Sequence, residues 1–189
     1  MTCIVGLEHD GKVWMGGDAA ASDSEGNDIR RYASPKVFAV TRGTEPFLMG
    51  FTHSFRMGQI LQFSLTPPTC GRHRDPFEYM VNDFADALRE VYKTKGFLSS
   101  DDEGTERGGT FLVGFRGSLY IMESDFHVAQ PDIGKLGCAF HAVGCGDNPA
   151  LGSLYSTQRR GPENRCYTAL AAAAVFCSAV RAPFTVLSL

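Results

Sequence analysis

The first residue with a reactive side chain is Thr2, which follows Met1 and opens the apolar run of residues 2–7. Removal of Met1, which a small residue at position 2 permits, leaves a threonine at the amino terminus. Such a threonine combines a hydroxyl nucleophile with its own α-amine as a base. The amine titrates near ~7.7–8.0, so much of it is neutral at cytosolic pH. Thr2 is therefore a candidate catalytic nucleophile.

A tight turn brings a carboxylate back toward Thr2. The sequence His9-Asp10-Gly11-Lys12 lies between the apolar runs 2–7 and 13–15, which is typical of a β-hairpin. In two-residue-turn register the numbers of paired residues sum to about 21. Thr2 then lies opposite Asp18 and its neighbour. Asp18 is a candidate partner of Thr2, although a carboxylate there is also an ordinary end to a strand.

A third candidate is Lys36, at the start of the β-rich run 36–40. A buried ammonium beside a carboxylate is physically reasonable, because each charge compensates part of the desolvation of the other. An Asp18–Lys36 pair could serve as a structural salt bridge alone. Its position beside Thr2 favours a catalytic role.

Four segments in order resemble the signature of proteasome β subunits and the bacterial peptidase HslV. They are Thr2, Gly17-Asp18, Lys36-Val37 and Gly144-Cys145-Gly146. The resemblance covers nearly the whole chain. It implies an α+β fold, the four-layer αββα sandwich of amino-terminal-nucleophile (Ntn) hydrolases, with two antiparallel β-sheets between helical layers. Residues 1–189 would form one such domain, with threonine-type endopeptidase activity.

The resemblance also implies roles for particular residues. Thr2 would be the nucleophile, Lys36 the cation that assists its deprotonation, and Asp18 the group that holds Lys36. Cys145 and Ser178 would support them. In substrate binding, Phe51 would form the floor of the pocket for the substrate side chain that precedes the cut. Its bulk would make that pocket smaller and disfavour large side chains. The backbone N–H near His53 would stabilise an oxyanion.

Three positions depart from the family pattern. Cys145 replaces the serine of Gly-Ser-Gly, and a thiol is a weaker hydrogen-bonding group than a hydroxyl. Val175 stands where the family has a second aspartate, and His53 falls at the oxyanion-hole glycine. Thr2, Asp18 and Lys36 are kept. We therefore expect activity, with a degenerate structural subunit as the alternative.

Composition excludes several classes of function. The chain has 189 residues and a net charge of −3, so it lacks the basic surface expected of a nucleic-acid-binding protein. No apolar run reaches the ~20 residues needed to cross a membrane. The six cysteines follow no secretory signal, which predicts free thiols and a cytoplasmic location. Cys70-Gly71-Arg72-His73 lacks a second ligand pair, so neither metal nor cofactor is expected.

By resemblance, the partners are a peptide or unfolded protein as substrate, copies of the chain in a homo-oligomeric ring, and an ATP-dependent unfoldase or cap. Two further alternatives stay open. One is an Ntn amidohydrolase that acts on a small amide. The other is a binding module that retains Met1.

The remaining elements must hold these residues in place. We expect a strand over 47–51 and a helix over 54–65, followed by a helix whose N-cap is Asp75 and whose apolar face includes Phe77 and Val81. Segment 99–109 is expected to be a polar surface loop. The later elements expected are a hairpin over 110–122, a strand over 139–143, a helix capped by Asp147 or Asn148, a helix over 165–180 and a last strand over 184–187.

Overall fold

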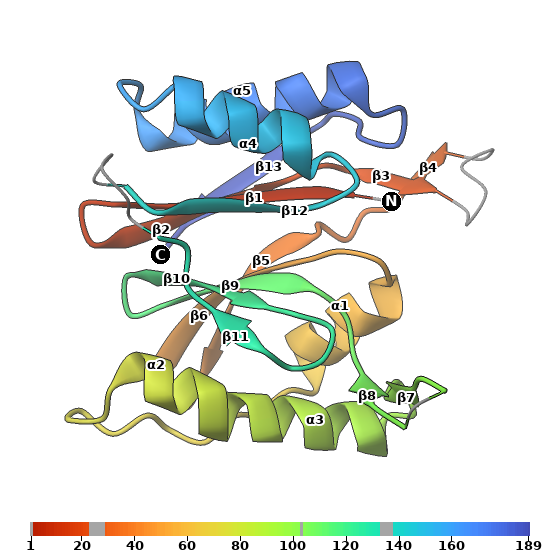
Figure 1. The fold of residues 1–189 in the computed structure, drawn as a ribbon, viewed down its shortest axis with the longest axis vertical. Helices are drawn as coiled ribbons and strands as arrows, with labels where there is room; N and C mark the ends of the chain where they lie inside the picture. The colour runs from red at the N-terminus through yellow and green to blue at the C-terminus, as the bar shows by residue number, and fades with distance from the viewer. Residues whose placement is uncertain (1, 23–28, 103, 133–137) are drawn as a thin grey trace.

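The computed structural model describes residues 2–22, 29–102, 104–132 and 138–189. Met1, whose removal would free the α-amine of Thr2, lies outside the described residues. Two antiparallel sheets face each other, and helices lie on their outer sides (Figure 1). The predicted mixed α and β fold with antiparallel sheets is therefore confirmed.

The sheet that carries the amino terminus has the strand order β12-β1-β2-β13. Its central pair is the predicted hairpin: Ile4 lies opposite Gly17 and His9 opposite Lys12, so each pair of numbers sums to 21. The register places Thr2 level with Ala19, next to Asp18. The strands are β1 (Cys3–His9), β2 (Lys12–Gly17), β12 (Phe140–Gly144) and β13 (Thr185–Ser188).

The second sheet has the order β11-β10-β9-β6-β5. Its β9–β10 hairpin turns at Arg116 and Gly117, both with positive φ, as the sequence predicts for that segment. The strands are β5 (Val37–Arg42), β6 (Glu45–Phe51), β9 (Phe111–Phe115), β10 (Ser118–Met122) and β11 (Val128–Ala129). Two short hairpins complete the strands: β3 (Ala20–Ser22) with β4 (Ile29–Arg31), and β7 (Ser99–Ser100) with β8 (Glu106–Arg107).

Helices cover the outer face of each sheet (Figure 1). Helices α4 (Asp147–Ser156) and α5 (Pro162–Phe176) pack on the four-stranded sheet through small and aliphatic side chains such as Ala169 and Leu170. The five-stranded sheet is covered by α1 (Phe55–Phe63) and by a continuous helical segment of α2 (Pro76–Tyr79), a π-helical turn η1 (Met80–Phe84) and α3 (Ala85–Thr94). Between the two sheets, a third cluster packs Ile4 and Met15 against Leu48 and Leu112.

Several expected details are wrong. The π-turn η1 adds a residue to the helical repeat and rotates the apolar face, so Phe77 and Val81 are exposed rather than buried. The N-cap of α4 is Gly146, because Asp147 already lies inside the first turn, where its carboxylate accepts the N–H of Asn148.

Two segment boundaries also differ. The last helix starts earlier, at Pro162, whose fixed φ suits a first helical position, and ends at Phe176 rather than near residue 180. The polar segment 99–109 contains the short β7–β8 hairpin, which Arg107 stabilises through an ion pair with Asp101.

Candidate active site

A buried cluster joins the three residues that sequence analysis places together. Nζ of Lys36 lies 2.8 Å from Oγ1 of Thr2 and 2.8 Å from Oδ1 of Asp18. Thr2 is 5% exposed, and Asp18 and Lys36 are each 2% exposed. The ammonium therefore donates to the hydroxyl and to the carboxylate at once, with almost no access for bulk water.

Strand ends position all three side chains. Thr2 immediately precedes β1, Asp18 immediately follows β2, and Lys36 immediately precedes β5 of the other sheet. The N–H of Asp18 donates to the carbonyl of Cys3 at 3.3 Å, which extends the β1–β2 ladder to this corner. The hairpin register thus sets Thr2 beside Asp18, and the facing sheet delivers Lys36 to both.

Backbone donors hold the Asp18 carboxylate in place. Oδ1 accepts the N–H of Cys3 at 3.1 Å, and Oδ2 accepts the N–H of Ala20 at 2.9 Å and that of Arg181 at 3.4 Å. Donors from three separate segments of the chain therefore fix the orientation of the Asp18 carboxylate.

Burial lowers the pKa of Lys36, because the charged ammonium loses its hydration, and the neighbouring Asp18 carboxylate opposes that effect. The lysine thus loses its proton at a lower pH than an exposed lysine does. A cation of this kind stabilises negative charge that develops on the Thr2 oxygen.

The turn after β12 lies against the main chain of Thr2. Gly144 has φ +104°, and its register partner on β1 is Cys3. The thiol of Cys145 donates to the carbonyl oxygen of Thr2 at 3.4 Å, and the Cys177 thiol donates to Sγ of Cys145 at 3.2 Å. Burial, reinforced by that bond from Cys177, raises the pKa of the Cys145 thiol. The side chain of Cys145 therefore contacts the main chain of Thr2, the predicted nucleophile.

His53 follows β6 with an unusual backbone. Its φ is +61°, a conformation that glycine adopts readily and that strains a side-chain-bearing residue. No described residue accepts its backbone N–H. Oγ1 of Thr52 donates to the carbonyl of Thr110 at 2.7 Å and lies 2.7 Å from Nδ1 of His53. Because that hydroxyl has a single hydrogen, Nδ1 must donate it the second bond, which leaves Nε2 of a neutral imidazole as an acceptor.

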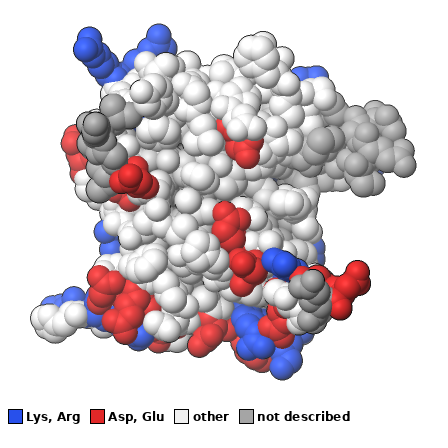
Figure 2. All heavy atoms as spheres, viewed as in Figure 1, with Lys and Arg blue, Asp and Glu red and all other residues white. Residues whose placement is uncertain are grey.

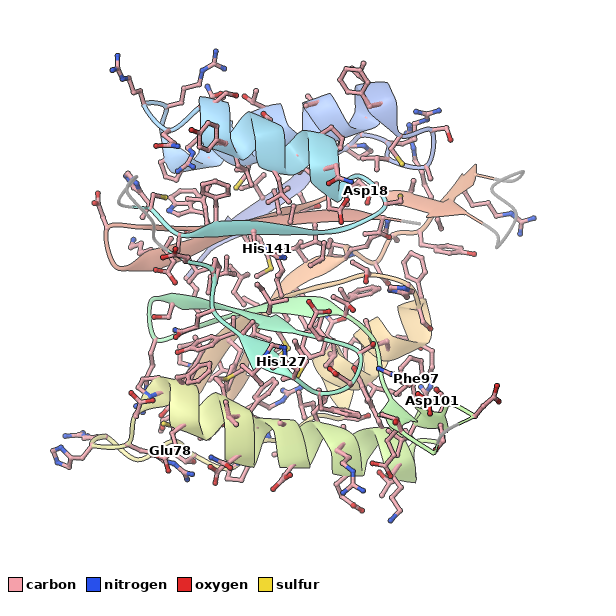
Figure 3. The ribbon with its side chains drawn as sticks, in the orientation of Figure 1. Asp18, Glu78, Phe97, Asp101, His127 and His141 are labelled. Carbon is pink, nitrogen blue, oxygen red and sulfur yellow. The ribbon has the colours of Figure 1, made fainter. Side chains whose placement is uncertain are left out.

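A cavity of about 440 Å³ opens beside Thr2. His141 on β12 lies between the two sheets (Figure 3), and burial lowers its pKa, against the effect of Glu123 and Asp147. The polar or flexible residues that line this cavity are Thr2, Thr52, His53, Thr110, Glu123, His141, Gly144, Cys145 and Asp147.

Figure 2 shows the molecular surface in the same view. Acidic side chains lie on the middle of this face, whereas most of the basic side chains in view lie toward its margins.

Phe51 lies on a second hollow. Its ring packs against Gly58 of α1 so closely that a β-carbon at position 58 would lie 2.3 Å from it, and against Phe55 at a ring-centroid distance of 5.7 Å. The hollow has a volume of about 520 Å³, and Tyr32, Pro35 and Phe55 line it with Phe51. Phe51 is therefore a wall of this apolar hollow and is not among the residues that line the Thr2 cavity.

Ser178 and Val175 lie at the end of α5. Ser178 is exposed in the turn that follows the helix, and no hydrogen bond joins its side chain to a residue in the described ranges. Val175 is 76% exposed. The structure brings Thr2, Asp18, Lys36, Cys145 and His53 to one site. The backbone N–H of Phe51 donates to the carbonyl of Lys36 at 3.1 Å, but the Phe51 ring lines the other hollow. Ser178 lies outside the site.

Four residues at or beside the site are not indicated by the sequence: Cys177, Thr52, Glu123 and His141. Cys177 is the immediate neighbour of Ser178, but nothing in the sequence indicates which of the two faces Cys145. Glu123 and His141 follow from the register only once the β1–β12 and β9–β10 pairings are known. Within the described residues, no group of three or more His, Cys, Asp or Glu side chains is placed to hold a metal ion. No helix in the described part of the chain is long and apolar enough to cross a membrane.

Solved structures of low sequence identity have the same fold. The chain matches Thiobacillus denitrificans BPH, solved in complex with epoxomicin, with a TM-score of 0.77 and 18% identity over 100% of this chain and 98% of that one. It matches eukaryotic HslV from Trypanosoma brucei with a TM-score of 0.67 and 15% identity, over 100% of this chain and 99% of that one. It matches Anbu from Pseudomonas aeruginosa, solved as a helical assembly, with a TM-score of 0.65 and 14% identity, over 100% of this chain and 81% of that one.

No protein-family model matches the sequence, and neither does any curated protein sequence. The chain has the proteasome- and HslV-like fold that the four sequence segments predict.

Proposed function

We propose that the chain is a threonine-type peptidase of the Ntn-hydrolase class, with Thr2 as its amino-terminal nucleophile once Met1 is removed. The observation that carries the proposal is the position of Lys36 Nζ, 2.8 Å from both Thr2 Oγ1 and Asp18 Oδ1 in a buried cluster. The fold shared with HslV and with the epoxomicin complex of BPH supports it.

The chemistry is acyl transfer. Oγ1 of Thr2 attacks the carbonyl carbon of a peptide bond, and its proton passes to the freed α-amine. Lys36 stabilises the developing charge on Oγ1, and the backbone N–H of His53 donates to the oxyanion. The amine then returns a proton to the leaving nitrogen, which departs as the new amino terminus. Water, activated by the same amine, hydrolyses the ester and regenerates Thr2.

Architecture and context belong to the same proposal. Residues 1–189 form a single domain with the four-layer αββα arrangement of Ntn hydrolases. We place the protein in the cytoplasm as a homo-oligomeric ring that takes peptide or unfolded-protein substrates, with an ATP-dependent unfoldase or cap as partner.

The proposal is tested by intact-mass measurement after incubation with an epoxyketone such as epoxomicin. We expect an adduct on the Met1-free wild type, none on Thr2→Ala, and none on Lys36→Ala although both variants keep their circular dichroism spectra. An adduct on Thr2→Ala equal to that of the wild type would show labelling elsewhere and contradict the role of Thr2.

Three other outcomes separate the alternatives. A protein that has lost Met1, assembles and forms no adduct would favour a non-catalytic structural subunit. An adduct combined with hydrolysis of small acyl amides, and no cleavage of an unfolded protein such as casein, would favour an amidohydrolase. Retention of Met1 under all expression conditions would exclude both enzymes.

A further inference from the structure

Two thiols meet beside the Thr2 cavity. Cys145, in the turn between β12 and α4, has its Sγ 3.2 Å from Sγ of Cys177, which is the C-cap of α5. The two residues are 32 positions apart in sequence. A disulfide needs a sulfur–sulfur distance of about 2.05 Å, so the pair lies roughly 1 Å from bonding distance.

Accessibility singles out this pair among the cysteines. Cys145 is exposed and Cys177 is half-buried, whereas Cys3, Cys70 and Cys166 are buried. Cys138 donates to the carbonyl of Glu8 and also contacts Arg165. An oxidant from solvent therefore reaches Cys145 first and finds a second thiol in contact with it.

We infer that Cys145 and Cys177 form a reversible dithiol–disulfide site whose oxidant is a peroxide. The Cys145 thiolate attacks one peroxide oxygen, forming an S–O bond and breaking the O–O bond, and the leaving hydroxide takes a proton to become water. The Cys177 thiolate then attacks the sulfenic sulfur, forming the S–S bond and releasing the second water. Two thiols are oxidised and one peroxide is reduced. A dithiol reductant reverses the reaction by exchange.

The disulfide would act on the Thr2 site from two sides. Cys145 would lose the S–H that donates to the Thr2 carbonyl. The turn that begins at Cys177 also holds Asp18, because the carbonyl of Arg181 accepts the N–H of Ala19 at 3.0 Å and the N–H of Arg181 donates to Asp18. Closing the bond therefore pulls on Thr2 and on Asp18 together. This consequence rests on the proposed function, whereas formation of the bond does not.

The test uses the full-length wild-type protein and Cys177→Ala. Each is incubated with hydrogen peroxide at mildly alkaline pH, because burial raises the pKa of Cys145 and the thiolate is the reactive form. Remaining thiols are alkylated, and chymotrypsin, which cuts after aromatic residues, separates residues 141–155 from residues 177–184. Each fragment holds a single cysteine, Cys145 or Cys177, so a cross-linked pair is unambiguous.

We expect the cross-linked pair in the oxidised wild type and its loss after dithiothreitol. Cys177→Ala should instead carry sulfenic or higher oxides on Cys145. Free or singly oxidised thiols in the wild type, with no cross-link, would overturn the site.

A second readout follows epoxyketone labelling of Thr2. Oxidised wild type should label at least several-fold more slowly than the reduced protein, with full recovery on reduction, and peroxide should slow Cys177→Ala less. Equal rates for oxidised and reduced wild type would overturn the regulatory role. If the reduced wild type is not labelled at all, the proposed peptidase function fails, and the cross-link alone decides the site.

Discussion

Gly144 lies directly against the carbonyl oxygen of Thr2: a β-carbon at position 144 would be 2.1 Å from that oxygen. The contact explains why the turn after β12 needs a glycine, since φ there is +104° and the main chain of Thr2 occupies the space of a side chain. We expect Gly144→Ala to displace Thr2 from Lys36. Because a misplacement of about 1 Å costs on the order of a hundredfold in rate, labelling by the epoxyketone should fall by about that factor.

Gly152 supplies the matched control. It lies in α4, a few residues beyond Gly144, and nothing lies within 4 Å of a β-carbon placed there. Gly152→Ala should stabilise the protein by up to ~1 kcal/mol, because alanine is the better helix former, and should leave labelling unchanged. Equal labelling of Gly144→Ala and wild type would show that Thr2 tolerates the crowding.

Removal of Asp18 and removal of Lys36 should lower the free energy of unfolding by different amounts. In Lys36→Met, the carboxylate keeps the N–H donors of Cys3 and Ala20. In Asp18→Ala, the buried Lys36 ammonium keeps the Thr2 hydroxyl as an acceptor but loses the carboxylate, and the N–H groups of Cys3 and Ala20 lose their acceptor. We expect Asp18→Ala to cost roughly 3–5 kcal/mol of unfolding free energy and Lys36→Met clearly less. Urea unfolding with matched m-values measures both, and a larger cost for Lys36→Met would contradict this account.

His53 should be replaceable by glycine. If the backbone N–H is the part that acts, His53→Gly keeps the donor and removes the strain of φ +61°. We expect unchanged or faster labelling and a gain in stability of up to ~1 kcal/mol, the relief of strain being offset in part by the greater entropy of an unfolded glycine.

His53→Ala separates the imidazole from the backbone. It removes the ring while keeping a side chain at positive φ, so it should label like the wild type without the gain in stability. A large loss of labelling in both variants would instead assign the role to the imidazole, whose Nε2 is left as an acceptor by the bond to Thr52.

Local signals in the sequence predicted one half of the site and could not predict the other. The hairpin register follows from one turn and fixes Asp18 beside Thr2. Lys36 immediately precedes β5 of the opposite sheet, so its contact with Thr2 depends on how the two sheets pack against each other. The residues of a turn do not determine that packing. The family resemblance supplied that contact.

The predictions for Ser178 and Phe51 differ from the structure for the same physical reason. Ser178 and Cys177 are adjacent, and which of them faces Cys145 depends on where α5 ends, which the alanine-rich stretch leaves undefined. Phe51 was expected at the substrate pocket of Thr2, whereas its ring packs over Gly58. That outcome depends on how α1 docks, a tertiary contact between residues whose types are ordinary for a core.

The pH dependence of Thr2 labelling follows from two groups. The α-amine freed by loss of Met1 must be neutral to accept the hydroxyl proton, so the rate should rise through ~7.7–8.0. Lys36 must be charged to stabilise the oxygen. Since burial lowers the pKa of Lys36, the rate should fall again at a pH below the ordinary lysine value of 10.5. In Lys36→Arg, whose guanidinium stays charged, the overall rate is lower but the alkaline fall should disappear.

Loss of labelling through unfolding can be distinguished from loss of labelling through deprotonation of Lys36. The distinction rests on the direction in which Lys36 changes the free energy of unfolding as pH rises. Between the lowered pKa of Lys36 and 10.5, the unfolded chain binds more protons at this residue than the folded chain. Lys36 therefore makes the folded state more stable as pH rises. Buried thiols and phenols such as Cys3 and Tyr92, whose pKa values burial raises, act in the opposite direction once their unfolded forms ionise. Circular dichroism at each pH identifies the range in which the fold is intact. A fall in labelling within that range, present in the wild type and absent in Lys36→Arg, assigns it to Lys36, whereas the same fall in both proteins would remove Lys36 from the mechanism.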